Sequence, residues 1–179
     1  MNQQKPGGQR PPLNKLQRKQ SPASGRERQD ASRVRNLQLF RAGPLHFGMF
    51  ADDIATIVAW REPTPLPHAP KSILGIVSVQ GRMLTVLDLA ALTDREAVSN
   101  EASTQHLIAL RGDEQLALAI ETLDETIEIA ADDFDAKRET GEPLVLGVLH
   151  RKGGEVNILN PKELFPSAIQ GRERRRRRF

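Results

Sequence analysis

The middle of this 179-residue chain repeats itself. Residues 73–92 align with residues 145–164 at an offset of 72 and without a gap. Five aligned pairs are identical, and five more exchange one apolar residue for another. The identical pairs are Leu74/Leu146, Gly75/Gly147, Gly81/Gly153, Leu87/Leu159 and Leu92/Leu164. A repeat of this kind indicates one structural unit present twice, so we expect the two halves to fold alike.

Each half of the repeat has the pattern of short β-strands. Leu45, Phe47 and Met49 alternate with other residues, as in a strand with one buried face. Residues 74–79 and 83–87 predict a hairpin around Gln80-Gly81-Arg82. The strands predicted for the two halves are 37–41, 45–49, 56–60, 74–79 and 83–87, and 105–110, 115–120, 126–129, 144–150 and 155–159. Helices are predicted only as short turns at 89–92 and from Pro161 to Leu164.

Five short strands in each half predict an all-β protein made of two small barrels. The predicted domain spans residues 37–170. Its first barrel covers about 37–98 and its second about 104–166, and an exchange of strands between them stays open. Each barrel alone would be small for stable folding, so we expect the two to share a core region.

Five residues of the repeat are predicted to shape the backbone rather than to bind a partner. Asp88 ends an apolar strand directly before Leu89, where a carboxylate can cap the following helical turn. The other four are the glycines that keep their places in both halves, which we assign to turns: Gly75, Gly81, Gly147 and Gly153.

The net charge of +3 conceals three regions of different charge. Residues 1–36 carry nine basic and two acidic side chains, and residues 171–179 carry six arginines and one glutamate. Residues 37–170 hold 11 basic and 20 acidic side chains. Because the two flanking segments have few apolar residues to offset chain entropy, we predict disordered basic tails at 1–36 and 171–179.

The chain has no cysteine, which excludes disulfides, a thiol nucleophile and thiolate metal sites. No apolar run approaches the about 18–20 residues that cross a bilayer, and the first residues lack the apolar core of a signal peptide. We therefore expect a cytoplasmic protein.

The sequence shows no constellation typical of an enzyme. Its four histidines lack metal-ligand spacing, and it has neither a phosphate-binding glycine loop nor a nucleophile motif. Two acidic clusters, Asp52-Asp53 and Asp132-Asp133-Asp135, are more typical of a solvated surface than of acid–base catalysis. We predict no catalytic residue, no metal, no cofactor and no small-molecule substrate.

The stretch from Leu66 to Leu89, with its prolines, its two glycines and its Asp88-Leu89 pair, resembles the CheW-like domain of bacterial chemotaxis. The resemblance covers about residues 37–166. It implies two five-stranded, SH3-like barrels, which agrees with the repeat. It also implies a non-catalytic adaptor that joins the cytoplasmic tip of a chemoreceptor to the regulatory domain of a CheA-type histidine kinase. Such an adaptor would lie at a membrane-bound signalling array.

The chain departs from the family pattern at two polar positions that are associated with partner docking. The family arginine before the turn glycine is Gln80, and the family glutamate of the preceding short strand is Thr56. Glutamine cannot make the charge-assisted, bidentate bonds of arginine, so receptor coupling should be weakened or retargeted. Arg82 places a cation two residues further along.

The residues predicted to contact a partner are Ile54, Thr56, Ile57, Val79, Gln80 and Arg82. The apolar members of this set, together with Val77, have a second interpretation as barrel core. The alternative is that some of them line an apolar groove that receives a partner helix. The sequence does not separate the two.

A second function also stays open, in which the domain serves as a localisation or tethering scaffold. The basic tails would then make weak electrostatic contacts with an anionic membrane, with nucleic acid or with another protein. Alternatively, they only keep the chain in solution.

Overall fold

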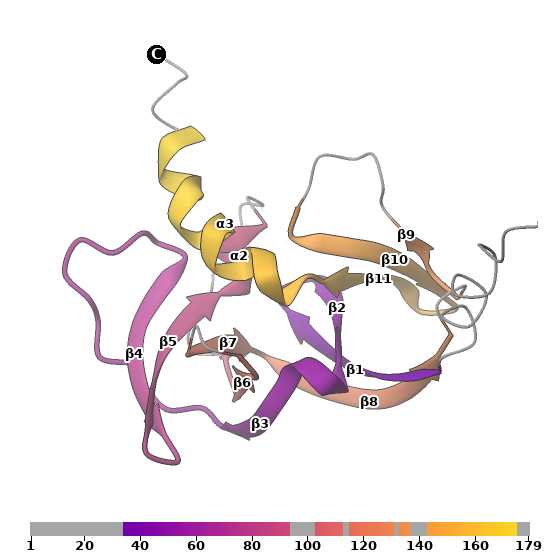
Figure 1. Ribbon diagram of the computed structural model, residues 1–179, viewed down its shortest axis with the longest axis horizontal. Coiled ribbons are helices and arrows are strands. Elements are labelled where there is room, and N and C mark those ends of the chain that lie inside the picture. Colours follow the sequence, from indigo (N-terminus) through magenta and orange to yellow (C-terminus); the bar gives the residue numbers. More distant parts are fainter. Residues whose placement is uncertain (1–33, 94–102, 113–114, 131–132, 137–142, 175–179) are drawn as a thin grey trace, which may run out of the picture.

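The computed structural model describes residues 34–93, 103–112, 115–130, 133–136 and 143–174. Its first half contains β1 (Arg35–Ala42), β2 (Leu45–Phe50), the 3-10 turn η1 (Ala51–Asp53), β3 (Ile54–Ala59), β4 (Ile73–Val79), β5 (Arg82–Asp88) and α2 (Leu89–Leu92). Its second half contains β6 (His106–Leu110), β7 (Leu116–Ile120), β8 (Thr122–Ile129), β9 (Asp135–Ala136), β10 (Val145–Arg151), β11 (Gly154–Leu159) and α3 (Pro161–Arg174). Strands dominate both halves, so the predicted all-β class is confirmed (Figure 1).

Each of the two sheets takes strands from both halves of the repeat. The first sheet has the order β8-β1-β2-β11-β10-β9, and the second has the order β3-β6-β7-β5-β4. The first two strands of each half therefore lie beside the last strands of the other half. Two parallel pairs, β2 with β11 and β5 with β7, make these junctions.

The two sheets are related strand by strand. Exchanging β1, β2, β3, β4 and β5 with β6, β7, β8, β10 and β11 converts the order of the second sheet into that of the first, apart from the additional short strand β9. The hairpins also share a register irregularity, between Ile73 and Gly75 in one and between Val145 and Gly147 in the other. The repeat in the sequence is thus a repeat in the structure.

Neither sheet is closed into a complete barrel by hydrogen bonds among the described residues. At the β4 edge the reason lies in the proline-rich segment between β3 and β4. Its residue Thr64 exchanges backbone hydrogen bonds with Ile76, at 2.8 and 2.9 Å, and so occupies the place of a neighbouring strand. Prolines on both sides of Thr64 lack an amide donor, so this pairing stays isolated.

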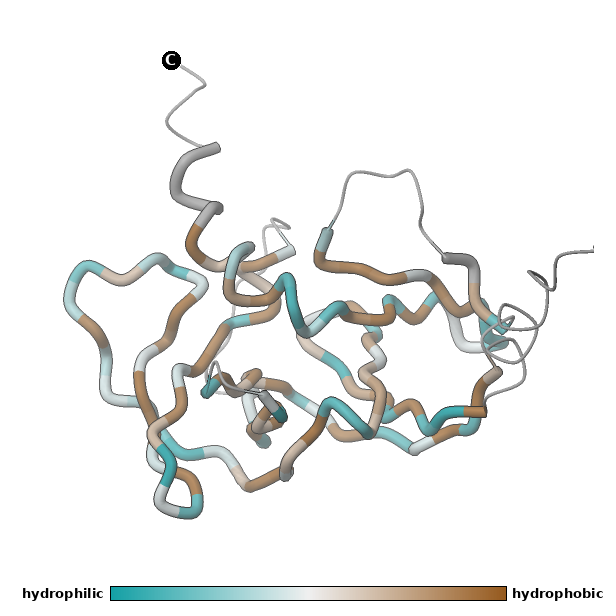
Figure 2. Tube along the Cα trace, in the orientation of Figure 1, coloured by the Kyte–Doolittle hydropathy of each residue, from teal (hydrophilic) through white to brown (hydrophobic). Residues whose placement is uncertain are grey.

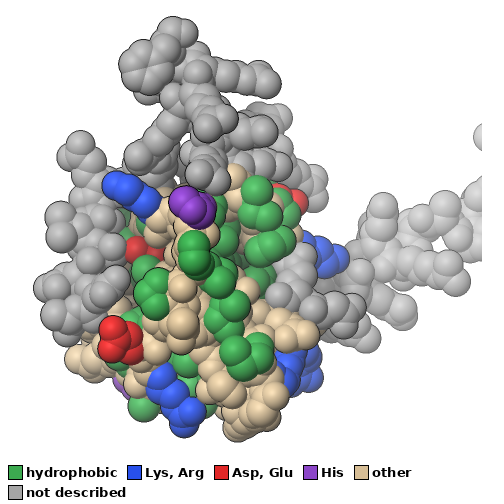
Figure 3. Space-filling model, turned by 90° about the vertical axis from the view of Figure 1, so that its left-hand side faces the viewer, with side chains coloured by type: hydrophobic (Ala, Val, Ile, Leu, Met, Phe, Trp, Pro, Cys, Tyr) green, Lys and Arg blue, Asp and Glu red, His purple; other side chains and the backbone are tan. Residues whose placement is uncertain are grey.

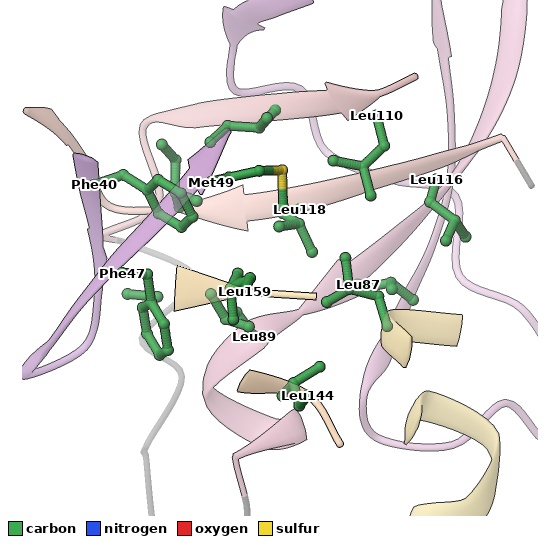
Figure 4. Close-up of a cluster of buried hydrophobic side chains, with 14 of the residues drawn as sticks. Phe40, Phe47, Met49, Leu87, Leu89, Leu110, Leu116, Leu118, Leu144 and Leu159 are labelled. Atoms are coloured by element: carbon green, nitrogen blue, oxygen red, sulfur yellow. The ribbon is translucent and has the colours of Figure 1, made fainter. Parts of the chain in front are cut away.

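The largest core lies between the two sheets (Figure 4). The first sheet contributes Phe40, Phe47 and Met49, and the second contributes Leu87, Ile108, Leu116 and Leu118. Two smaller cores lie on the opposite faces, one for each sheet. Along the chain, the turn between β4 and β5 is mostly hydrophilic, whereas the strands that enclose these cores are mostly hydrophobic (Figure 2).

Strand β7 shows how the sequence separates the cores. All five of its residues are buried. Leu116, Leu118 and Ile120 pack in the core between the sheets, while Ala117 and Ala119 pack on the other face of the second sheet. Because side chains alternate along a strand, the alternation of large and small residues assigns one size to each face.

Three polar side chains in the described ranges are buried, and each has a partner that ties elements together, whereas the buried Nδ1 of half-buried His106 has none. Gln38 donates to the carbonyl of Asp124 at 2.8 Å and accepts from the Thr126 hydroxyl at 2.6 Å, which links β1 to β8 at a bulge. Ser72 donates to the carbonyl of Ala168 in α3 at 2.9 Å. Asp88 accepts from the backbone amides of Ala90 and Ala91 at 3.0 and 3.2 Å, and so caps α2.

The C-terminal helix is longer than the short turn expected at 161–164. It runs to Arg174, so residues 171–174 of the predicted tail are helical, and β1 begins within the predicted N-terminal tail, at Arg35. Leu164 and Ala168 are fully buried in the core between the sheets, and this tertiary packing stabilises a helix that propensity alone does not. Residues 1–33 and 175–179 lie outside the described residues.

The glycines also differ from expectation at three of the four positions. Gly147 lies inside β10 rather than in a turn and has no positive φ. Gly75 lies inside β4 rather than in a turn, with a φ of +148°. In the second hairpin the left-handed backbone falls at Gly154, with a φ of +124°, whereas Gly153 has no positive φ. The central residues of this turn, Lys152 and Gly153, have no positive φ, so it differs from a turn with positive φ at both central positions, and the positive φ falls on the next residue, where glycine adopts it at least cost.

We expect Gly75→Ala to destabilise the protein far more than Gly112→Ala. Both glycines have similar φ values, +148° and +140°. A Cβ on Gly75 would lie 2.2 Å from the carbonyl oxygen of Thr64, whereas nothing lies within 4 Å of one on Gly112. The backbone strain should cost about 1–3 kcal/mol at either site, and the clash at Gly75 about 2 kcal/mol more. Urea unfolding measures both, and equal losses would contradict the close approach.

Candidate functional site

The residues predicted to contact a partner lie on two segments of the second sheet. Ile54, Thr56 and Ile57 are on β3, and the others are in the hairpin of β4 and β5. β3 and β4 are the two outer strands of that sheet. Both segments lie along the lower side of the molecule as drawn in Figure 1.

Burial divides the apolar members of this set. Val79 is 3% exposed and packs with Val77 in the core of the second sheet, so its side chain presents no surface to a partner. Ile54 and Ile57 are half-buried and pack against the edge of the core between the sheets. Thr56 is half-buried, and Gln80 and Arg82 are exposed.

The turn of this hairpin has a defined conformation. Gln80 and Gly81 have φ values of +50° and +79°. Positive φ at both central residues is the requirement of a type I′ turn, whose twist matches that of the flanking strands. Gln80 therefore lies at the tip of a tight hairpin, on a rigid support.

Hydrogen bonds connect this hairpin to the start of β3 through the turn that follows β6. Arg82 Nη2 donates to the carbonyl of Gly112 at 3.4 Å. The neighbouring Arg111 donates from its backbone to the carbonyl of Asp53 at 2.8 Å and from Nη2 to the carbonyl of Ile54 at 3.3 Å. The structure thus brings the two predicted segments together.

Sequence analysis did not identify Arg111. Its position in the repeat was informative, because Arg111 follows the apolar strand β6 at an offset of 70 from Arg41, which belongs to β1. Both are exposed cations. The contact with β3 could not be inferred in this way, since it depends on which strands are neighbours.

Next to the start of β3, η1 carries an acidic pair. The guanidinium of Arg35 lies 3.6 Å from the centroid of the Phe50 ring and forms salt bridges with Asp52 at 3.6 Å and Asp53 at 4.0 Å. Burial raises the pKa of the Asp53 carboxyl above its ordinary value, and Asp52 acts in the same direction, although Arg35 opposes both. This is a surface ion cluster; its geometry offers no second buried acid for catalysis.

An apolar band borders the hairpin. Met83, next to Arg82, is 58% exposed, and Leu66 of the proline-rich segment is 39% exposed. Figure 3 shows hydrophobic side chains running down this face of the molecule, with basic side chains at its lower rim. Apolar surface with a charged rim is typical of a protein-binding site.

Comparison with known proteins assigns this arrangement to a family. The family model described as the CheW-like domain matches residues 36–168, which span both sheets. The chain belongs to the CheW-like domain family. This family comprises scaffold and adaptor proteins of chemotaxis rather than enzymes.

Three relatives illustrate how far the likeness extends. The CheW-like chain is 23% identical to "Chemotaxis protein CheW" of Rhizobium meliloti (strain 1021), over 74% of this chain and 88% of that protein. It is 25% identical to "Protein FrzA" of Myxococcus xanthus, over 73% of this chain and 85% of that protein. The crystal structure of the scaffolding protein TtCheW from Thermoanaerobacter tengcongensis has the same fold, with a TM-score of 0.66 and 18% identity. The match covers 74% of this chain and 93% of that one.

Two features are absent from the described ranges of the chain. Those ranges contain no helix with the length and apolar character to cross a membrane. They also contain no group of three or more His, Cys, Asp or Glu side chains placed to hold a metal ion.

We expect Asp53→Asn to raise the melting temperature near neutral pH. Because the folded-state pKa of Asp53 is raised, the folded protein loses stability as pH rises through that value and the carboxylate becomes charged. An amide removes this cost, so the gain should vanish below the ordinary pKa of a carboxyl. Thermal unfolding from pH 3 to pH 7 measures it. Asp52→Asn, at a side chain 81% exposed, is the control, and a lower melting temperature for Asp53→Asn at pH 7 would contradict the assignment.

Proposed function

We propose that this CheW-like chain is a non-catalytic adaptor that couples a chemoreceptor to a CheA-type histidine kinase. The observation that carries the proposal is the family match across both sheets, residues 36–168. A relative whose name places it in chemotaxis matches over most of its own length, which supports the same role. The partners would be the regulatory domain of the kinase and the cytoplasmic tip of the receptor, at a membrane-bound array.

The contact surface that we propose consists of Ile54, Thr56, Ile57, Gln80 and Arg82. Val79 would not contact the partner; its buried side chain would hold the neighbouring Gln80 turn in place. The half-buried isoleucines supply apolar contact, and the exposed hairpin supplies polar contact. A partner helix laid across β3 and the hairpin tip would touch both kinds of residue.

The charge of the flanking segments favours a second candidate function. Residues 1–36 and 171–179 are strongly basic, whereas the domain between them is acidic. If the chain is a tether, these segments rather than the hairpin would carry binding, to an anionic membrane, to nucleic acid or to another protein.

A retention experiment tests the adaptor role. The full chain, immobilised, should retain the host's CheA-type regulatory domain or receptor cytoplasmic fragment at both low and moderate salt. Gln80→Arg should strengthen retention by about tenfold, because it adds a charge-assisted, bidentate donor at the hairpin tip. Lys152→Arg is the matched control, since Lys152 occupies the same repeat position in the other hairpin.

Two outcomes would contradict the proposal. Failure to retain either partner, with the chain shown to be folded, would reject the adaptor role and leave the tether as the better candidate. Equal effects of Gln80→Arg and Lys152→Arg would reject this hairpin as the specific contact surface.

A further inference from the structure

Three exposed arginines lie at the ends of strands of the second sheet. Arg61 follows β3, Arg82 begins β5 and Arg111 follows β6. Each donates to a backbone carbonyl of a neighbouring element, of Ser78 at 3.3 Å, Gly112 at 3.4 Å and Ile54 at 3.3 Å respectively. A guanidinium has five N–H donors, so each of these retains most of its capacity for further acceptors. We call Arg61, Arg82 and Arg111 the arginine row.

The members of the arginine row are connected through the residues to which they donate. Arg111 precedes Gly112, which accepts from Arg82. Arg82 precedes Met83, whose cross-strand partner is Ser78, the residue that accepts from Arg61. Hydrogen bonds, chain neighbours and one cross-strand pair therefore link the start of β3 to the segment that follows it, by way of the hairpin.

No member of the arginine row forms a salt bridge with a carboxylate in the part of the chain that the structure describes; Asp113 and Glu114 lie outside it. The arginines of the first sheet differ. Arg41 pairs with Asp124 at 3.3 Å, and Arg151 pairs with Glu125 at 2.9 Å.

The repeat explains the difference. Arg151 occupies the repeat position of Val79, at an offset of 72. Glu125 occupies the repeat position of Thr56. Ile127 pairs with Leu37 in β1, and Val58 pairs with the equivalent Leu107 in β6, so Ile127 and Val58 correspond. Glu125 and Thr56 each lie two residues before them. The ion pair that joins β8 to the hairpin in the first sheet is thus replaced in the second by a threonine and a buried valine. The second sheet therefore has no carboxylate at the repeat position of Glu125. The carboxylate near its arginines is that of Asp53 in η1; burial raises the pKa of this group, whereas Arg111 lowers it without forming a salt bridge to it.

Apolar surface lies beside these cations. Met83 is 58% exposed next to Arg82, and Ile54, whose carbonyl accepts from Arg111, is half-buried. Figure 3 shows the same association of hydrophobic and basic side chains on this face. A surface of this composition fits a segment that is itself both apolar and charged.

We infer that the arginine row selects the partner at this surface, and that the partner presents acidic side chains beside apolar ones on one protein segment. This rests on the proposed function, for which it names the chemistry of the partner. The row supplies the cations that Gln80 does not. Nucleic acid and anionic membrane fit less well, because residues 37–170 hold 20 acidic against 11 basic side chains and repel an extended polyanion.

Two variants of the full chain with equal changes of charge test the inference. Arg82→Gln/Arg111→Gln removes two members of the row, and Arg41→Gln/Arg151→Gln removes two arginines of the first sheet. The probe is a synthetic amphipathic peptide with leucines along one face and glutamates beside them. A peptide with lysines in place of the glutamates, a DNA duplex and anionic vesicles are the comparison ligands. Circular dichroism establishes that both variants are folded.

The wild-type chain should bind the glutamate peptide more tightly than the lysine peptide, and salt should weaken the binding. Loss of Arg82 and Arg111 should reduce affinity by about tenfold and flatten the salt dependence, whereas the first-sheet variant should change it by less than about twofold. Equal losses in the two variants, equal binding of both peptides, or tighter binding to DNA or vesicles would overturn the inference. The peptide assay needs no kinase or receptor, so its outcome is separate from that of the retention experiment.

Discussion

The core between the two sheets is the interaction on which the rest of this structure depends. It exists because β1 and β2 lie beside β11 in one sheet, while β6 and β7 lie beside β5 in the other. Neither half of the chain can unfold alone without breaking both sheets, since the parallel strand pairs β2–β11 and β5–β7 each join the two halves. Strand β7, buried on both faces, and α3, which closes the core with Leu164 and Ala168, strengthen the same coupling. Two units that would each be small for stable folding thereby share one large apolar interior.

This construction suits a scaffold. Its outer strands β3 and β8 hold equivalent places in the two sheets, and the shared core fixes their relation to one another. The two equivalent surfaces have nevertheless acquired different chemistry. In the first sheet, Arg151 and Glu125 satisfy each other, while in the second the arginine row bonds only to carbonyls among the described residues. The edge of the first sheet is thus paired internally, whereas the arginines at the edge of the second sheet form no salt bridge among the described residues.

The sequence predicted what depends on local pattern. Alternation located most of the strands, the aligned glycines located the hairpins, and the placement of Asp88 before Leu89 identified a cap. The membership of each sheet was not predictable, because periodicity says which face of a strand is buried and not which strand lies beside it. For the same reason the contact of Arg111 with β3 was missed, and Val77 and Val79 could not be separated from the half-buried isoleucines. Helix α3 was underestimated because tertiary packing, rather than propensity, extends it.

The central claim is that strand exchange makes both sheets one cooperative unit, and equilibrium unfolding tests it most directly. Trp60 is the single tryptophan and packs against the core of the second sheet, so its fluorescence reports that sheet. Amide hydrogen exchange in β1, β10 and β11 reports the first sheet. In guanidinium chloride the full chain should lose both signals in one coincident transition. Two separate transitions, with one sheet retaining its protection after the other has unfolded, would contradict the account.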